Sequence, residues 1–325
     1  MGTKENLLAL LEEQRGSYIS GEQIAGSLGI SRAAIWKAIK SLRSEGYEIE
    51  AVTNRGYRLS EQSDVLSCDA IKRLLSDLCK DLTIEVFEST ESTNLLCQNK
   101  ASEGFGEGYV AIASAQSAGR GRRGRSFYSP PGTGLYLSIL LEPRNYPGST
   151  ALDLTTMAAV AVCEAIEAVS DKNCGIKWVN DVYIDGKKVC GILSEASFSV
   201  EDGGISSVVV GIGINLYRPK GGFPKEIENI ACSIFDKKEG GKRSALAAEL
   251  INRFIAYYSN PEGASHFDEY KRRSMLIDKD VDVILPGATK KAHVLGLSDN
   301  CGLMVRYDDG SEETLRFGEV SVHAS

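Results

Sequence analysis

The stretch QSAGRGRRGRSF, residues 116–127, is the part of the chain from which its fold is best inferred. Three glycines and four arginines fill its positions 119–125. Glycine lets a ligand approach the backbone closely, and guanidinium groups match phosphate or carboxylate oxygens two at a time. This composition favours an anion-binding loop, and a basic loop that contacts nucleic acid is the alternative. The rest of the chain has to decide between the two.

Length and composition indicate a globular protein of two or three domains. The chain has 325 residues, of which 42% are hydrophobic and 25% charged, whereas one domain usually holds about 100 to 200 residues. No run of the sequence approaches the roughly 18 apolar residues of a membrane span. The N-terminal segment MGTKENLLALLEEQ carries acidic residues on both sides of a short apolar run, unlike a secretory signal. We therefore expect a cytoplasmic protein without a membrane partner.

Cysteine and charge patterns narrow the function further. The eight cysteines form no CxxC pair and the chain has only three histidines, so we expect buried thiols rather than a zinc site or disulfides. The net charge is −7, but residues 1–60 hold eight Lys/Arg and seven Asp/Glu, which makes that segment +1 and the remainder −8. A protein that coats nucleic acid along its whole length is thereby disfavoured.

Residues 1–64 have the pattern of a winged helix-turn-helix domain. After a helix near 6–13, residues 20–46 read as two helices joined by a tight turn, with Ser20 and Ser31 as N-caps. Residues 47–59 alternate like a hairpin that turns at 54–56. A helical protein-interaction module is the alternative, but basic residues on the second helix and at the wing tip, including Arg58, favour DNA. The candidate DNA-binding residues are Ser31, Arg32, Trp36, Lys37, Lys40 and Arg55.

The region from residue 81 to about 276 predicts a sheet with helices against it. A polar linker and a short helix from Asp69 occupy 65–80. Strand-like runs follow at 82–90, 108–116, 134–141, 174–184, 187–197 and 206–216, with helices at 151–169 and near 244–258. The pair Asp185-Gly186 is a strong turn signal, so 177–184 and 187–196 should form a hairpin that places Lys188 near the working surface of the sheet.

The last part of the chain, residues 277–325, is again strand-like. Runs at 280–287, 290–298, 302–317 and 319–324 predict a small, separate β-barrel.

Four polar pieces of the central region suggest a binding site. They are STN at 92–94, Gln116, the Gly/Arg loop, and KWVNDV at 177–182 with Lys188 beyond it. Two sources of positive charge and the glycine amides can stabilise a phosphate, and neutral donors and acceptors can hold an uncharged polar ring beside it.

These motifs, in this order, resemble the family of bifunctional biotin–protein ligases and biotin operon repressors. The resemblance includes GLYLSILL at 134–141 and GIGIN at 211–215 and covers nearly the whole chain. It implies a multidomain α+β fold. The expected parts are a winged helix-turn-helix DNA-binding domain at 1–64, a linker and short helix at 65–80, a catalytic domain with a class II synthetase-like mixed sheet and helices at 81–276, and an SH3-like β-barrel at 277–325.

The resemblance also implies a two-step reaction that uses biotin, ATP and Mg²⁺. The biotin carboxylate attacks the α-phosphate of ATP and forms biotinyl-5′-AMP, from which a lysine of a biotin carboxyl carrier protein domain then takes the biotinyl group. The same adenylate is expected to act as corepressor, to promote a homodimer and to direct the protein to biotin operator DNA.

Site residues are carried over by position. Arg122 and Lys188 are the expected catalytic residues, Asp181 is a possible Mg²⁺ ligand, and glycines 119, 121 and 124 are expected joints of a closing loop. The expected biotin and adenylate contacts are Ser92, Thr93, Asn94, Gln116, Gly119, Arg120, Gly121, Arg122, Arg123, Lys188, Gly191 and Asn215, with Phe127, Trp178, Asn180 and Asp181 as nearby support.

Two positions depart from the family pattern. Phe127 stands where the family has tryptophan, and it keeps an aromatic face but loses the indole donor. Val179 stands where the family has proline, and its β-branched side chain suits a strand.

Three other functions are alternatives to the ligase and repressor function. Lipoate attachment would use the same catalytic fold, and a transcription regulator could use the central domain only to sense a ligand. A nucleic-acid ligase is disfavoured, because its KxDG nucleophile motif is absent from the sequence.

Overall fold

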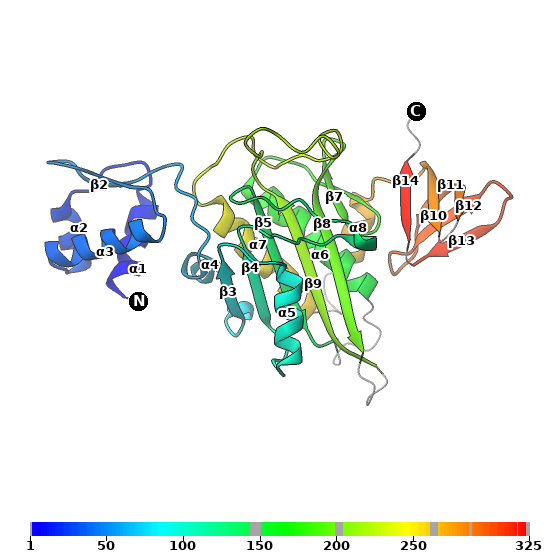
Figure 1. Ribbon diagram of the computed structural model, residues 1–325, viewed down its shortest axis with the longest axis horizontal. Helices are drawn as coiled ribbons and strands as arrows, with labels where there is room; N and C mark the ends of the chain where they lie inside the picture. Colours follow the sequence, from blue (N-terminus) through cyan, green and yellow to red (C-terminus); the bar gives the residue numbers. More distant parts are fainter. Residues whose placement is uncertain are drawn as a thin grey trace. The chain divides into compact units, whose positions relative to one another are not determined.

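Figure 1 shows a computed structural model of the chain, which describes residues 2–143, 151–198, 204–260, 266–285, 288–316 and 318–322. The chain divides into two compact units. The first comprises Met1–Leu74 and Lys237–Ala245, and the second comprises Leu75–Asp236 and Leu246–Ser325.

The first unit contains the predicted winged helix-turn-helix. Helices α1 (Thr3–Glu13), α2 (Gly21–Leu28) and α3 (Arg32–Ser44) pack around a core that includes Leu7, Ile24 and Ile35. The predicted capping box of α2 is present, since Ser20 and Gln23 exchange both hydrogen bonds. Strands β1 (Ile49–Val52) and β2 (Gly56–Leu59) pair as the predicted wing.

The chain after the wing is tied to the start of helix α7 (Lys242–Ser259). The Asp64 side chain is fully buried and pairs with Arg243, with 3.2 Å between Oδ2 and Nε. The Ser244 hydroxyl donates to the Val65 carbonyl at 3.1 Å. These contacts explain why residues 237–245 belong to the first unit, together with helix α4 (Cys68–Leu74).

The second unit is built on a seven-stranded mixed sheet in the order β3-β4-β5-β9-β8-β7-β6. Only β3 and β4 are parallel among these neighbours. The strands are β3 (Thr83–Phe87), β4 (Tyr109–Ala113), β5 (Gly134–Leu141), β6 (Gly175–Lys177), β7 (Asp181–Ile184), β8 (Lys187–Phe198) and β9 (Ile205–Asn215). Helix α6 (Ala151–Val169) has the predicted bounds, whereas the sequence predicted neither α5 (Thr93–Ser102) nor α8 (His266–Arg273) as helices.

Helices cover both faces of this sheet (Figure 1). Asn94 of α5 lies against Gly211, and Thr155 of α6 hydrogen-bonds to Ser194 at 2.7 Å. Ser194 pairs with Val210, the neighbour of Gly211, so the two contacts lie on opposite faces. Asn94 therefore marks the α5 face, and α6 packs on the other face of the sheet.

The hairpin of β7 and β8 forms at the predicted turn. Asp185 and Gly186 have φ values of 49° and 76°, as a tight hairpin turn requires. The expectation that Val179 lies in a strand is wrong. Residues 178–180 form a turn between β6 and β7, because the sheet ends at Lys177 and resumes at Asp181.

The C-terminal strands form the SH3-like part of the fold. The antiparallel strands β10 (Asp280–Leu285), β11 (Ala288–Leu297), β12 (Leu303–Tyr307), β13 (Glu312–Leu315) and β14 (Glu319–Val322) pair in the order β13-β12-β11-β10-β14. These strands form a sheet of their own, and both sheets belong to the second unit. One tie between them is the Trp178 indole, which donates to the Cys301 carbonyl at 2.9 Å.

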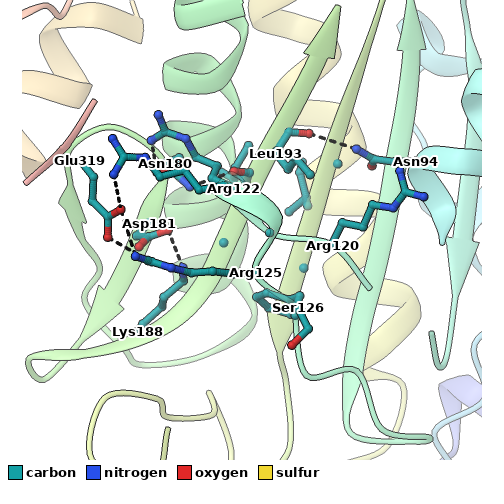
Figure 2. A pocket seen from close by; sticks show the side chains of 18 of the residues that line it. Asn94, Arg120, Arg122, Arg125, Ser126, Asn180, Asp181, Lys188, Leu193 and Glu319 are labelled. Atoms are coloured by element: carbon teal, nitrogen blue, oxygen red, sulfur yellow. Dashed lines mark hydrogen bonds and ion pairs between the residues drawn. The ribbon is translucent and has the colours of Figure 1, made fainter. Parts of the chain in front are cut away.

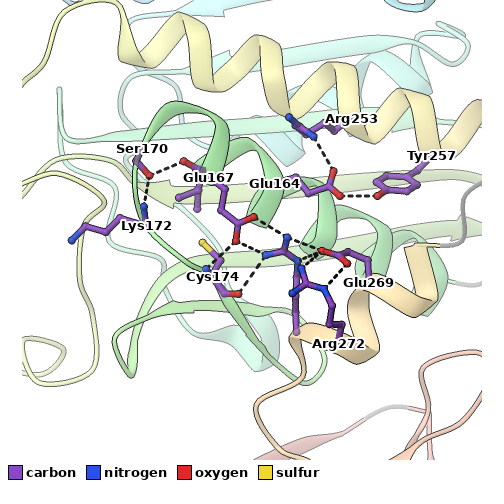
Figure 3. A network of polar contacts seen from close by, with 11 residues as sticks. Glu164, Glu167, Ser170, Lys172, Cys174, Arg253, Tyr257, Glu269 and Arg272 are labelled. Carbon is purple, nitrogen blue, oxygen red and sulfur yellow. Dashed lines mark hydrogen bonds and ion pairs between the residues drawn. The ribbon is translucent and has the colours of Figure 1, made fainter.

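A charged network joins α6, α7 and α8 (Figure 3). Arg273 of α8 pairs with Glu167 of α6 and with Glu269, and Arg253 of α7 pairs with Glu164 of α6 at 3.2 Å. The network fixes the helices on the face of the sheet away from α5. Among the helices of the described ranges, none has the length and apolar character needed to cross a membrane.

Candidate active site

A pocket of about 160 Å³ lies on the α5 face of the sheet, beneath the Gly/Arg loop. Its lining comes from α5, the loop, the turn before β7, strands β8 and β9, and β14. The structure brings together in this pocket the predicted site residues Ser92, Thr93, Asn94, Gln116, Arg120, Gly121, Arg122, Arg123, Phe127, Trp178, Asn180, Asp181, Lys188 and Gly191.

Two predicted ligand contacts do not line the pocket. The Asn215 amide donates to the Cys232 carbonyl at 3.1 Å and so holds the loop that follows β9. Gly119 is buried where the loop crosses its own return, and an added Cβ would lie 2.7 Å from the Phe127 carbonyl. Both residues therefore shape the surroundings of the pocket.

The floor of the pocket is made of glycines on β8 and β9. An added Cβ at Gly213 would lie 2.6 Å from the Phe127 ring, one at Gly191 would lie 3.1 Å from Lys188 Nζ, and one at Gly211 would overlap Asn94. These three glycines let side chains from other elements lie directly on the sheet. The Phe127 ring also meets Tyr136 edge to face, with 6.3 Å between ring centroids.

The arginines of the loop are held from the C-terminal barrel (Figure 2). Arg122 donates to Asn180 Oδ1 and to the Gly318 carbonyl, each at 3.0 Å. Arg125 pairs with Glu319 at 2.8 Å, and Arg123 Nη1 lies 3.4 Å from the same carboxylate. Burial lowers the pKa of Arg122 from its ordinary value.

Arg120 differs from the other three arginines. Its exposed side chain makes no hydrogen bond or ion pair within the part of the chain that the structure describes, although it lines the pocket. This guanidinium is therefore available to a ligand.

Backbone angles bear on the predicted hinge of the loop. Gly124 has a φ of 73°, which favours glycine, and Arg123 adopts 57°. Gly119 and Gly121 lie outside this left-handed region, so of the three predicted joints only Gly124 needs the backbone freedom of glycine.

Lys188 lies at the opposite side of the pocket from Asn94 in Figure 2. Its Nζ is 2.6 Å from Asp181 Oδ1, and the two side chains are 30% and 23% exposed. A register shift between β7 and β8 pairs Lys188 with Tyr183 and Cys190 with Val182. The ammonium group thereby faces the pocket, as the sequence predicts.

Several lining residues were not predicted. Gly211 and Gly213 belong to the GIGIN motif, whose alternating glycines on a strand signal a close approach to the sheet. Glu319 and Val320 come from the barrel, and no sequence pattern indicates that β14 reaches the Gly/Arg loop.

The carboxylates of the pocket bear on metal binding. In the described ranges, no three His, Cys, Asp or Glu side chains gather where they could hold a metal ion. Asp181, the predicted Mg²⁺ ligand, is engaged by Lys188.

A second candidate surface lies on the first unit. Arg32, Lys37 and Lys40 are exposed on α3, and Trp36 is 60% exposed beneath the Lys40 ammonium, which is 5.4 Å from the ring. The Ser31 hydroxyl accepts from the Ala34 amide and caps the helix.

The position of one basic residue of the wing differs from the prediction. Arg55 is exposed near the tip and lies 5.1 Å from the Tyr18 ring. Arg58 is not at the tip, because it lies within β2 and pairs with Glu50 at 2.7 Å. Of the predicted DNA-binding surface, the basic residues of α3 and Arg55 are therefore exposed, whereas Arg58 is paired.

Comparisons with known proteins agree with this architecture. A family model described as "Biotin/lipoate A/B protein ligase family" matches residues 86–215, and one described as "HTH domain" matches residues 3–58. A solved structure, the biotin protein ligase from Aquifex aeolicus in complex with biotin and ATP, matches with a TM-score of 0.63 and 26% identity, over 75% of this chain and 99% of that one.

Curated relatives extend the match to the whole chain. The bifunctional ligase/repressor BirA of Bacillus subtilis is 38% identical over 250 residues, which cover 77% of this chain and 73% of that protein. The bifunctional ligase/repressor BirA of Salmonella typhimurium is 30% identical over 328 residues, which cover 98% of this chain and 97% of that protein. With both domains present and a relative that matches from end to end, the chain belongs to the BirA family of bifunctional ligase/repressors.

Proposed function

We propose that this protein is an ATP-dependent biotin–protein ligase that also represses transcription. It joins biotin to AMP and then transfers the biotinyl group to a lysine of a biotin carboxyl carrier protein domain of a biotin-dependent carboxylase. One observation carries the proposal. The pocket places Lys188 and Arg122 beside a glycine floor and uncharged donors, in a chain of the BirA family.

The charges of the pocket suit the first step. A carboxylate oxygen of biotin attacks the α-phosphorus of ATP, and the bond to pyrophosphate breaks. Because both reactants are anions, positive charge is needed where negative charge builds up. Arg122 and Lys188, which line the same pocket, supply it. Mg²⁺ would arrive with ATP and neutralise phosphate charge. We propose Asp181, which pairs with Lys188 at 2.6 Å, as the carboxylate that would help to hold it.

The second step transfers the biotinyl group. The carrier lysine attacks the acyl carbon of biotinyl-5′-AMP, and AMP leaves. The mixed anhydride hydrolyses in water, so a loop that covers it also protects it. We assign the ring of biotin to the end of the pocket with Ser92, Gln116 and Arg120, and the phosphate to the end with Arg122 and Lys188.

The first unit supports a repressor function. Arg32, Lys37 and Arg55 would contact operator DNA, with the adenylate as corepressor and as promoter of a homodimer whose symmetry the operator shares. In gel shifts, Arg32→Ala and Lys37→Ala should weaken binding and reduce its salt dependence. A shift unaffected by biotinyl-5′-AMP would contradict the corepressor role. The functional boundaries we propose are 1–64, 65–80, 81–276 and 277–325, in a cytoplasmic protein.

Mass spectrometry tests the ligase function directly. A carrier domain incubated with this protein, biotin and ATP should gain one biotinyl group on a lysine. Because the matched family description also names lipoate, a parallel reaction should offer lipoate instead. If lipoate is transferred and biotin is not, lipoate is the substrate. Absence of pyrophosphate release with either acid would favour a ligand-sensing regulator.

A further inference from the structure

A chain of buried hydrogen bonds runs beneath the polar end of the pocket. It connects the side chains of Glu195, Asn94, Ser138, Thr93, Gln116 and Ser129. Ser138 is fully buried, and Thr93, Asn94 and Ser129 are 3%, 6% and 6% exposed. A buried polar group that loses its partner costs free energy, so each donor here has to meet an acceptor.

At the β8 end of this series of hydrogen bonds, the chemistry of the partners shows which groups donate and which accept. Asn94 Nδ2 lies 2.6 Å from the Glu195 carboxylate and 3.3 Å from the Leu193 carbonyl, and both of these groups accept. The Asn94 oxygen therefore faces Ser138 Oγ, 2.6 Å away. The one hydroxyl hydrogen of Ser138 serves both the Asn94 oxygen and the Thr93 oxygen, which lie 2.6 and 2.7 Å from Ser138 Oγ. The Thr93 hydroxyl donates in turn to the Gln116 oxygen at 3.2 Å.

At the other end the donors run the opposite way along the series, towards the Phe127 carbonyl. The Phe127 carbonyl accepts from the Ser129 hydroxyl at 3.0 Å, so the Ser129 oxygen accepts from Gln116 Nε2 at 3.2 Å. The Gln116 oxygen then faces the Thr93 amide at 2.9 Å. One Nε2 hydrogen of Gln116 is left over for the pocket.

This series of hydrogen bonds distinguishes residues that support the pocket from residues that can bind a ligand. Both amide atoms of Asn94 are engaged, so Asn94 is a support. The Ser92 hydroxyl lines the pocket and has no hydrogen-bond partner among the residues that the structure describes. Ser92, Arg120 and the remaining hydrogen of Gln116 are thus the donors offered to a ligand.

We propose that Ser138 and Glu195 are positioning residues for the ligase reaction proposed above, on which this inference rests. They hold Asn94 and Thr93, and through the Thr93 hydroxyl the Gln116 amide, and so help fix the polar groups that the pocket presents. A cyclic urea, such as the head group of biotin, has a carbonyl that accepts between two N–H groups that donate, so it needs donors and acceptors held in a set order. The apolar dithiolane ring of lipoate makes no such demand.

Steady-state kinetics of variants test the proposal. In Ser138→Ala and Glu195→Ala, the KM for biotin should rise about tenfold or more, because buried polar groups lose their hydrogen-bond partners. The KM for ATP and kcat should stay within about twofold. Glu195→Gln keeps an acceptor for Asn94 and should remain within about threefold of the wild type. Thr156→Val is the matched control, because its fully buried hydroxyl lies away from the pocket, on the α6 face, and bonds to the Asp153 carbonyl.

Three outcomes are distinct. The split between the two KM values, with Glu195→Gln rescuing Glu195→Ala, supports the proposal. If the wild-type chain releases no pyrophosphate with biotin and ATP, the proposed function fails and this inference fails with it. If the wild type is active and the folded Glu195→Ala variant keeps its KM for biotin, or raises both KM values equally, only the positioning roles are overturned. Thermal unfolding shows which variants are folded.

Discussion

Two arginine-rich clusters of the second unit use the same side chain for opposite purposes. In the helical network of Figure 3, the arginines are matched by carboxylates: Arg253, Arg272 and Arg273 face Glu164, Glu167, Glu249 and Glu269. In the Gly/Arg loop of Figure 2, Arg123 and Arg125 share one carboxylate, Glu319, and Arg122 donates to neutral oxygens. The Arg120 side chain has no partner in the described ranges.

The difference shows that the surrounding acids, rather than the arginines, decide the role. Hydrogen bonds from Arg272 lower the pKa of Glu269 to about 2, so this carboxylate stays charged, and the three arginines of the helical network are fully offset by its four glutamates. The loop keeps an excess of positive charge on a backbone rich in glycine. A neutralised cluster stabilises the fold, and an unneutralised one attracts an anion.

The largest expected effect comes from removing charge at the pocket. Arg122→Ala or Lys188→Ala should lower the rate of biotin transfer by about 100- to 1000-fold, because transition-state charge loses its stabilisation. Transfer to a carrier domain is the measurement, with unfolding temperature as a check on the fold. Lys187→Ala, one residue away and exposed, is the control and should transfer biotin normally. Normal labelling by both pocket variants would refute the assignment.

Breaking the helical network should instead affect stability. Arg273→Met leaves Glu167 and Glu269 without their buried partner, whose side chain is only 5% exposed, and should lower the free energy of unfolding by about 3 kcal/mol. Urea unfolding measures this loss, and the KM for biotin should not change. Arg272→Met removes an arginine that is 65% exposed and should cost less than about 1 kcal/mol. Equal losses in the two variants would contradict the comparison.

Acid should weaken the same helical region through His266. Burial lowers the pKa of His266 from 6.5 to about 4. The unfolded chain binds a proton at this residue below about pH 6.5 and the folded chain only near pH 4, so stability falls as the pH drops between these values. At pH 5 this difference in proton binding lowers the free energy of unfolding by roughly 2 kcal/mol relative to neutral pH. Urea unfolding of His266→Phe should show a smaller loss between pH 7 and 5, and an unchanged pH dependence would exclude His266 as the cause.

The smallest expected effect on stability concerns the ion pairs between the Gly/Arg loop and Glu319 of β14. Arg125 is 67% exposed and Glu319 28%, so Glu319→Gln should change the free energy of unfolding by less than about 1 kcal/mol. Trypsin should nevertheless cut the loop severalfold faster in this variant, since the carboxylate holds two of its arginines. Biotin with ATP should slow cleavage in the wild type. Cleavage that neither the substitution nor the ligands alter would argue against a closing loop.

Much of the fold follows from the sequence because its signals are local. The caps at Ser20 and Ser31, the turn at Asp185-Gly186 and the helix at 151–169 were all predicted, since capping, turn chemistry and apolar periodicity act over a few residues. Helix α5 was missed because its faces differ little in hydrophobicity, and α8 because it is short and highly charged. Val179 was misplaced because β-branching favours strands only where a strand continues.

The candidate site was predictable where residue type determines chemistry. Arg122, Lys188 and Gln116 follow from motifs, and the structure places all three at one pocket. Glu319, Ser138 and Glu195 could not be found in this way. Their roles depend on which distant strands meet, and a serine within GLYLSILL or a glutamate near the end of a strand carries no signal of its own.

The glycine floor makes the pocket adjustable from one side only. Any side chain added at Gly191, Gly211 or Gly213 would displace Lys188, Asn94 or Phe127 before it touched a substrate. Random mutagenesis aimed at the specificity for the carboxylic acid substrate should therefore give inactive proteins when these glycines of β8 and β9 are replaced. Replacement of the other residues that line the pocket should alter the range of substrates. Phe127 lines the pocket without belonging to these strands, and it is the natural starting point for such retuning.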